Sequence, residues 1–199
     1  LGARWDVVEK SWFVPADINV RLFERWILAN DTSDADINIR SRGFFIMKSS
    51  RDCWKCKKIT DVFCFLLPKN HQVKYYDDDE REYWYSCNEA TKLNNTRILN
   101  QKAIESMRTL TSHYTLDFSR QAGVSYYMNH CQSCASKLGD FYMHDEPDGG
   151  FWLVTKDNTE KENLYWFDER FSGFSSYSDG DNLLQYTEKV EDMRSIIEE

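Results

Sequence analysis

The stretch DCWKC at residues 52–56 is followed, much later in the chain, by HCQSC at residues 130–134. Each holds a Cys-x-x-Cys pair, a spacing whose tight turn lets two sulfurs point at one atom while nearby amides donate hydrogen bonds to them. Two such turns supply a complete tetrahedral shell. The sequence therefore predicts one metal site with four ligands, Cys53, Cys56, Cys131 and Cys134.

Zinc is the expected ion, in a structural role. Four thiolates suit the commonest structural metal, although iron accepts the same geometry. A catalytic zinc keeps one position open for water, whereas four thiolates leave none. A catalytic alternative would need His130 to displace a cysteine, with His113 and His144 within reach, but we expect a histidine beside a Cys pair to lie outside the ligand shell.

The six cysteines also allow other interpretations. They could form three disulfides in an oxidising compartment, but four fall in two pairs while Cys64 and Cys87 stand alone, which favours metal binding in a reducing cytosol. A redox role is disfavoured because reactive Cys-x-x-Cys pairs sit at helix N-termini, and both pairs here follow predicted strands. We expect a cytoplasmic protein.

Charge and length restrict the function further. The chain has 199 residues and a net charge of −8, which argues against a general positive field for nucleic acid. Lys55, Lys57 and Lys58 beside the first pair still form a local basic cluster. No stretch approaches the roughly 20 apolar residues that span a bilayer, so no membrane partner is expected. Because the sequence opens on Leu1, we expect it to begin inside a longer native chain.

Apolar runs and alternation predict the strands. Residues 43–47 and 59–67 flank DCWKC and predict a hairpin with two cysteines at its tip. Residues 123–128 form a strand that runs into HCQSC. Further strands are predicted at residues 11–14, 139–144 and 150–154.

Helical spacing predicts three helices, over residues 17–27, 96–114 and 181–197, and polar composition predicts loops at 32–38, 75–90 and 172–181. The expected fold class is α+β: a small strand-helix N-terminal unit plus a zinc-stapled antiparallel sheet with two helices. The predicted domains are a strand-helix module at 1–31, a zinc-ribbon-like β domain with an inserted helix at 39–160, and a loop with a C-terminal amphipathic helix packing on the core at 161–199.

The first residues carry a family resemblance. The pattern LGARWD at 1–6, KSWFVP at 10–15 and FERW at 23–26 resembles a small bacterial module of unknown function, found in primase-like and mobile-element proteins. In that family an extended segment and a short helix precede LGARWD, so the module here is truncated at its N-terminus. The resemblance covers residues 1–27 and implies a bacterial origin and a tiny α+β unit; it transfers no catalytic residue.

A second resemblance covers residues 43–154. The pairs CWKC and CQSC, followed by LGDFYMHDEPDGGFW, look like the knuckles and hairpin of uncharacterised bacterial zinc-ribbon proteins. Ribbon knuckles often carry Pro and Gly around the cysteines, and this sequence departs from that pattern with Trp54, Lys55, Gln132, Ser133 and Ala135. The resemblance implies a bound zinc ion but leaves the subfamily, and so the function, open.

The sequence favours binding over catalysis. It contains no G-x-S-x-G, P-loop or HExxH motif, so we expect a protein that is not an enzyme. Aromatic residues make up 15% of the chain, and such side chains dominate protein interfaces. We expect a protein partner, such as a basic toxin domain that this acidic chain neutralises as an immunity protein. The alternative is a nucleic-acid-binding zinc-ribbon module of a mobile element; the sequence does not identify partner-binding residues.

Overall fold

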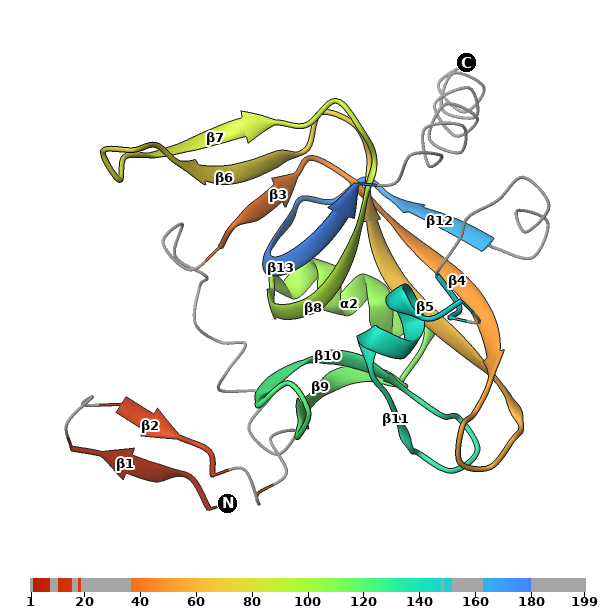
Figure 1. Cartoon of the computed structure of the whole chain (residues 1–199). Helices are drawn as coiled ribbons and strands as arrows, with labels where there is room; N and C mark the ends of the chain where they lie inside the picture. The colour runs from red at the N-terminus through yellow and green to blue at the C-terminus, as the bar shows by residue number, and fades with distance from the viewer. Residues whose placement is uncertain are drawn as a thin grey trace.

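The computed structural model describes residues 2–7, 11–15, 18, 37–147, 149–151 and 163–179. Strands dominate this part of the chain, which has one α-helix and one π-helical turn, η3 (Figure 1). The elements are β1 (Arg4–Asp6), β2 (Ser11–Phe13), β3 (Ile39–Ser41), β4 (Phe44–Asp52), β5 (Ile59–Leu67), β6 (Gln72–Tyr76), β7 (Glu82–Ser86), β8 (Thr91–Leu99), α2 (Gln101–Leu110), β9 (Tyr114–Ser119), β10 (Val124–His130), β11 (Lys137–Leu138), η3 (Phe141–Asp145), β12 (Asn163–Phe167) and β13 (Phe171–Asp179). The α+β prediction is therefore wrong, and the fold is mainly antiparallel β.

The strands of the described residues form three antiparallel sheets. The largest has eight strands in the order β12-β4-β5-β8-β13-β3-β6-β7, a second has the order β11-β10-β9, and β1 pairs with β2. Strands β12 and β13, which come after residue 160, lie in the same sheet as β4, β5 and β8. The domain boundaries at residues 31, 39 and 160 remain predictions.

The half of the β4–β5 hairpin away from the cysteine turn is buried on both faces, as its apolar runs at residues 44–47 and 62–67 require. Side chains of a strand alternate between its two faces. On β5, Phe63 and Phe65 enter one apolar cluster, whereas Val62, Cys64 and Leu66 enter another on the opposite face. The predicted hairpin around DCWKC is confirmed, with its pairing running from Phe45 opposite Leu66 to Asp52 opposite Ile59.

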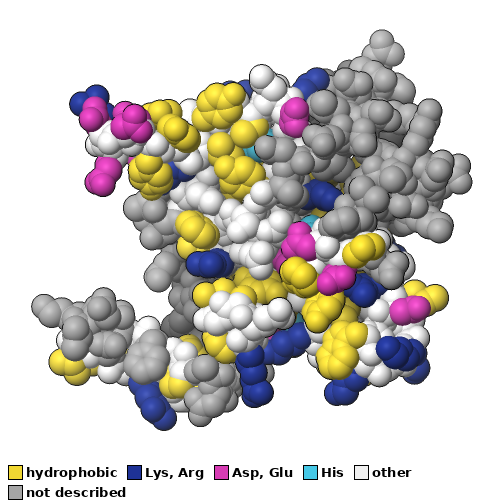
Figure 2. Space-filling view, viewed as in Figure 1, with side chains coloured by type: hydrophobic (Ala, Val, Ile, Leu, Met, Phe, Trp, Pro, Cys, Tyr) yellow, Lys and Arg dark blue, Asp and Glu magenta, His cyan; other side chains and the backbone are white. Residues whose placement is uncertain are grey.

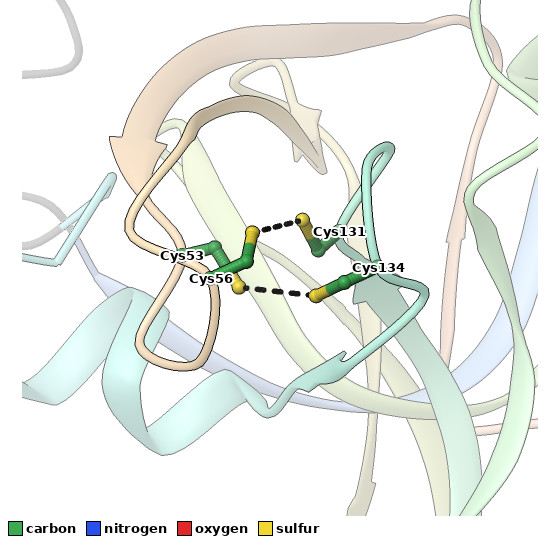
Figure 3. A group of neighbouring side chains, drawn as sticks. All are labelled: Cys53, Cys56, Cys131 and Cys134. Atoms are coloured by element: carbon green, nitrogen blue, oxygen red, sulfur yellow. Dashed lines mark hydrogen bonds between the residues drawn. The ribbon is translucent and has the colours of Figure 1, made fainter.

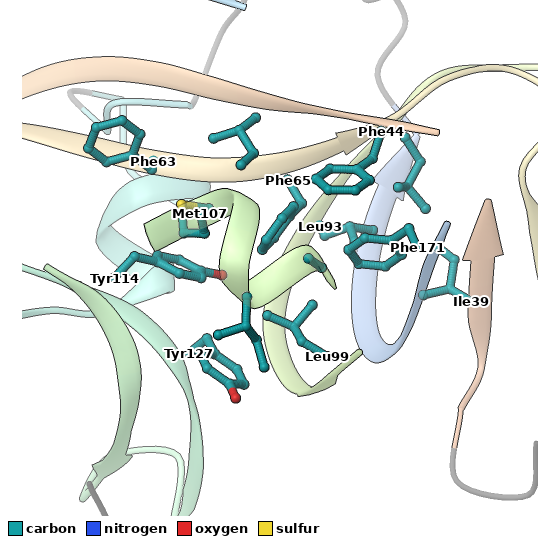
Figure 4. Packing of buried hydrophobic residues seen from close by; sticks show 14 of the residues in the cluster. Ile39, Phe44, Phe63, Phe65, Leu93, Leu99, Met107, Tyr114, Tyr127 and Phe171 are labelled. Carbon is teal, nitrogen blue, oxygen red and sulfur yellow. The ribbon is translucent and has the colours of Figure 1, made fainter. Parts of the chain in front are cut away.

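Helix α2 lies inside the apolar cluster that contains Phe63 and Phe65. It is surrounded there by side chains from β4, β5, β8, β9, β10 and β13 (Figure 4). Its sequence is rich in helix formers, and the amide of Gln101 donates to Glu105 one turn later at 2.9 Å. Ala103, Ile104 and Met107 form its buried stripe. The helix therefore fills the space between the eight-stranded and the three-stranded sheets.

The predicted helix over residues 96–114 is too long at both ends, because α2 ends at Leu110 and Tyr114 begins β9. Residues up to Leu99 belong to β8, which pairs with β13 from Gly173 opposite Leu99 to Asp179 opposite Thr91. The loop predicted at 172–181 is largely this partner strand, β13. The small residues of β13 give it no clear alternation of apolar and polar side chains in the sequence. They have a structural role, because a Cβ on Gly173 would lie 2.4 Å from the Ile98 carbonyl oxygen, and only glycine allows the two backbones to approach.

Two further predictions are wrong. The loop predicted at 75–90 contains the β6–β7 hairpin, because alternating Tyr and Trp side chains outweigh the acidic run, which forms only the turn. The strand predicted at residues 139–144 is also wrong, because residues Phe141–Asp145 form the π-helical turn η3, with Met143 and His144 buried.

Other predictions fall mostly outside the described residues: the helices at 17–27 and 181–197, the strand residues 152–154 and the loop residues 32–36. In the described part of the chain, no helix has the length and apolar character needed to cross a membrane.

Candidate metal centre

The four predicted cysteines meet at one point, where the β4–β5 turn faces the turn between β10 and β11 (Figure 3). All four sulfur atoms lie within 4.8 Å of one another. The Cys53 and Cys134 sulfurs are 3.7 Å apart, and those of Cys56 and Cys131 are 3.6 Å apart. A tetrahedral ion with metal–sulfur bonds of about 2.3 Å separates its ligands by about 3.8 Å, so the four cysteines could hold a metal ion.

The sulfurs are not arranged as disulfides. A disulfide requires about 2.05 Å between sulfurs, and none of the six cysteines, all of which lie in the described part of the chain, forms one. The disulfide interpretation is therefore not the arrangement found here.

The two turns have the same backbone geometry, although their sequences differ. The Cys53 N–H donates to the Lys58 carbonyl and the Lys57 N–H donates back to the Cys53 carbonyl, both at 2.9 Å. In the second turn, Cys131 donates to Ser136 at 2.9 Å and Ala135 donates to Cys131 at 2.8 Å. Each turn thus presents its two sulfurs in the same way.

The residue after the second cysteine has a positive φ in both turns: 60° for Lys57 and 53° for Ala135. This left-handed conformation normally favours glycine, because a Cβ there costs about 1 kcal/mol or more. The absence of glycine noted in the sequence therefore does not change the turn; the hydrogen bonds and the ligand geometry hold Lys57 and Ala135 in a strained conformation.

Hydrogen-bond donors around the second turn favour thiolates. The Ser136 hydroxyl, 3.1 Å from the Cys134 sulfur, together with the Ser136 N–H lowers the pKa of Cys134 to about 6. Burial opposes ionisation of Cys131, but the N–H groups of Cys134 and Ser133, together with the sulfurs of Cys53 and Cys56, lower its pKa. Metal ions bind the thiolate form, so these donors prepare the turn for a cation.

Side chains also tie one turn to the other. The Trp54 indole N–H donates to the Lys137 carbonyl at 2.9 Å, and the Gln132 N–H donates to the Thr60 hydroxyl at 3.1 Å. Trp54 and Thr60 belong to the β4–β5 hairpin, whereas Gln132 and Lys137 belong to the β10–β11 segment. The two halves of the site are thus joined by direct contacts besides the sulfurs.

Asn129 joins the sheets just before the second turn, where β5 has separated from β8. Its amide donates to the Phe63 carbonyl at 2.9 Å, and its side-chain oxygen accepts the Phe63 N–H at 2.8 Å. One buried side chain therefore supplies both hydrogen bonds that a neighbouring strand would give. The sequence offered little signal for this role, because a lone asparagine at a strand end is usually a turn residue.

The histidines considered in the sequence have other partners. His130 Nε2 lies 3.0 Å from a carboxylate oxygen of Asp117, and its Nδ1 lies 3.4 Å from the Thr115 hydroxyl. The His130 N–H donates to the His113 carbonyl, and the His144 ring packs 5.2 Å from that of Phe151. The group of potential ligands found in the described residues contains the four cysteines and no histidine.

Asp140 is a buried acid that the sequence did not single out. Its carboxylate accepts the Asn95 N–H at 2.6 Å, and it precedes η3. Burial raises its pKa to about 7; the Asp145 carboxylate adds to this effect and the Asn95 hydrogen bond opposes it. The acid is therefore uncharged over much of the acidic pH range in the folded protein.

The raised pKa predicts a pH-dependent stability. Between about pH 4 and pH 7 the folded state holds a proton that the unfolded state releases, so stability falls as pH rises. Relative to Asp140→Asn, the wild type should lose up to about 4 kcal/mol of unfolding free energy from pH 4 to pH 8. Urea titrations of both proteins across this range measure the difference. A difference that does not change with pH would show that Asp140 does not titrate there.

Comparison with known proteins identifies only the start of the chain. Residues 1–27 match a domain of unknown function (DUF5710), which confirms the small N-terminal module of unknown function. No curated protein and no solved structure matches the chain. The resemblance of residues 43–154 to zinc ribbons therefore remains a prediction.

Proposed function

We propose that this protein is a non-catalytic binding protein whose four-cysteine site holds a structural zinc ion and whose β6–β7 ribbon docks a basic protein. The exposed tyrosine face of that ribbon is the observation that carries the proposal. The protein would act in the reducing cytosol, where four thiolates stay available to the metal.

The metal is proposed to be structural because four cysteine sulfurs would fill its coordination shell. Four sulfurs at tetrahedral separation leave no position for a water molecule or a substrate. Zinc is preferred to iron as the commonest ion in closed sites of this kind, although both accept four thiolates. The ion would connect the β4–β5 hairpin to the β10–β11 turn.

The β6–β7 ribbon projects from the rest of the eight-stranded sheet (Figure 1). Tyr75 pairs with Tyr83 and Val73 with Tyr85, so these residues share one face of the ribbon. The three tyrosines are 55%, 44% and 57% exposed, and the Tyr75 and Tyr83 rings lie 5.2 Å apart. Tyrosine is enriched where interfaces are strongest, so this face is suited to a protein partner.

On the opposite face of the ribbon, the ring of Trp84 has cationic partners, whereas Tyr76 is 56% exposed. The Arg40 guanidinium lies 4.0 Å above the Trp84 ring, and the Lys74 ammonium lies 5.4 Å from it. Lys74 also pairs with Glu82 at 2.8 Å. Trp84 is therefore held by contacts within the molecule, whereas the face of Tyr75, Tyr83 and Tyr85 gathers three exposed rings, as expected of a docking surface.

The charge of the ribbon tip argues for a basic partner. Residues 77–80 are four consecutive acids, and Figure 2 shows acidic side chains at the tip with hydrophobic ones along the ribbon. The Asp77 carboxylate accepts the N–H groups of Asp79 and Arg81 at 3.0 and 2.8 Å, which fixes the turn. A negative tip on an acidic chain speeds the encounter with a positive protein.

A basic toxin domain is a partner of this chemistry, in which case the protein would serve as its immunity protein. A toxin gene beside the gene for this chain would agree with that role. A neighbouring primase gene would instead favour a nucleic-acid role.

Capture from the native host with matched variants tests the docking surface. The metal-loaded chain should retain a basic protein, and Tyr75→Ser with Tyr83→Ser should weaken the purified complex about 30-fold or more, as loss of a hot spot does. Tyr142→Ser, at an exposed tyrosine outside the ribbon, is the control and should bind as the wild type does. Recovery of nucleic acid alone, or equal retention by the double variant, would refute the proposal.

A further inference from the structure

A second surface lies beside the metal-binding turns, away from the ribbon. It is a pocket of about 800 Å³ formed by the β9–β10 turn, the first cysteine turn, the start of β11 and η3. Aromatic and basic side chains dominate its walls: Trp54, Phe118, Arg120, Lys137, Phe141 and Tyr142. Figure 2 shows hydrophobic side chains gathered beside Lys and Arg in the lower half of this face.

The aromatic rings of the pocket are exposed and held in place. Trp54 is 58% exposed, although its indole N–H is fixed on the Lys137 carbonyl at 2.9 Å. The Phe141 and Tyr142 rings meet edge to face at 5.7 Å, and Arg51 donates to the Tyr142 carbonyl at 2.6 Å. Rings that are fixed and open to solvent can stack on a planar ligand with little loss of conformational entropy.

The floor of the pocket is polar and rigid. Tyr126 lines the pocket, and its hydroxyl accepts the Asp140 N–H at 3.3 Å. Asp140 in turn accepts the N–H of Asn95, which also lines the pocket. These contacts join β8, β10 and η3, so the walls are set before any ligand arrives.

The charges beside the pocket are suited to phosphate. Arg120 is exposed on its wall, and Lys55, Lys57 and Lys58 are exposed on the adjoining cysteine turn. Asp145 is the one acidic residue among the lining residues. Over residues 37–151 the chain has 16 Lys and Arg against 14 Asp and Glu, so the acidic excess of the chain comes from its other segments.

We propose that this pocket and the lysines beside it bind single-stranded nucleic acid: a base stacks on Trp54 and the η3 aromatics, and the adjoining phosphates contact Arg120 and the turn lysines. This inference goes beyond the protein-docking function and uses a different surface. A strand is favoured over a free nucleotide because the three lysines extend past the pocket, where only the backbone of neighbouring nucleotides would reach. A duplex is disfavoured because its bases are not free to stack on side chains.

Fluorescence anisotropy of a labelled single-stranded oligonucleotide, with the metal-loaded full chain, tests the proposal. Trp54→Ala should lower the affinity by about 5- to 150-fold, the range for loss of one stacking ring. Trp54→Phe keeps a ring without the hydrogen bond to Lys137 and should restore most of the affinity. This second variant separates stacking from any loosening of the turn, which the metal content and the melting temperature also report.

The contribution of the three turn lysines can be measured separately, through the salt dependence of the affinity. Replacing Lys55, Lys57 and Lys58 by Gln should reduce the slope of log affinity against log salt by about 2, from roughly 0.7 for each phosphate contact on a single strand. Tyr83→Ser, on the ribbon, should bind the strand as the wild type does. A lower affinity with an unchanged salt slope would contradict the phosphate contacts.

Three results would overturn the proposal. One is no anisotropy change with the single strand at low salt. Another is equal affinity of wild type and Trp54→Ala, or equal affinity for a duplex of the same sequence. The third is competition by a mononucleotide at the same concentration as the strand, which would reassign the pocket to a free nucleotide.

Discussion

Removal of the proposed zinc ion at neutral pH is expected to lower the melting temperature by about 20 to 40 °C. Zinc binding contributes on the order of 10 kcal/mol to small folds, and each kcal/mol corresponds to about 2–4 °C in a chain of this size. The effect should be large because the ion joins turns separated by more than 70 residues, so its loss releases the β4–β5 hairpin from the β10–β11 turn.

Calorimetry before and after chelation measures this shift, and elemental analysis of the untreated protein should find one zinc per chain. Cys53→Ser should melt like the chelated protein. Cys87→Ser is the matched control, since Cys87 lies outside the group of four sulfurs and should keep the metal. An unmoved melting curve in metal-free protein, or the absence of stoichiometric metal, would contradict the structural role.

Asn129→Ala is expected to destabilise the protein by about 2–6 kcal/mol, because it leaves the buried N–H and carbonyl of Phe63 without their partner. The midpoint of urea unfolding in the metal-loaded protein measures the loss. Hydrogen exchange adds a local measurement, since the Phe63 amide should lose its protection in the variant.

Gln121→Ala removes the same kind of side chain from the exposed β9–β10 turn and serves as the control, with an expected change within about 0.5 kcal/mol. If Asn129→Ala costs no more than this control, the connection between the two sheets depends on the metal and the apolar clusters and not on the amide.

The sequence predicted the parts of the fold that depend on short-range pattern. The apolar run of β5 and the Cys-x-x-Cys spacings were sufficient for the central hairpin and for naming the four sulfurs that the structure brings together. The sequence predictions fail where the secondary structure of a segment depends on strands that are distant in the sequence. Small residues in β13 become a strand only because β8 and β3 lie beside them, and no local pattern reveals that pairing.

The surroundings of the site were also beyond the sequence. Asn129 and Ser136 act through contacts with β5 and with Cys134, and neither has a recognisable motif. The acidic run at residues 77–80 indicates a solvated loop, and this signal outweighs the short strands β6 and β7 on either side of it. Local composition described the turn correctly but not the strands that the turn connects.

Burial of one half of the β4–β5 hairpin on both faces has a consequence for its strand alignment. In most antiparallel pairs, sliding one strand by a single residue exposes its apolar side chains, and this penalty selects the correct alignment. In the apolar half, where Phe45–Met47 pair with Cys64–Leu66, such a slip would exchange one apolar set for another, so burial alone selects the alignment only weakly there. The polar half constrains the alignment more strongly, because a slip would break the Lys48–Asp61 ion pair at 2.9 Å. The register of the central hairpin therefore depends on its polar end and on the cysteine turn that closes it.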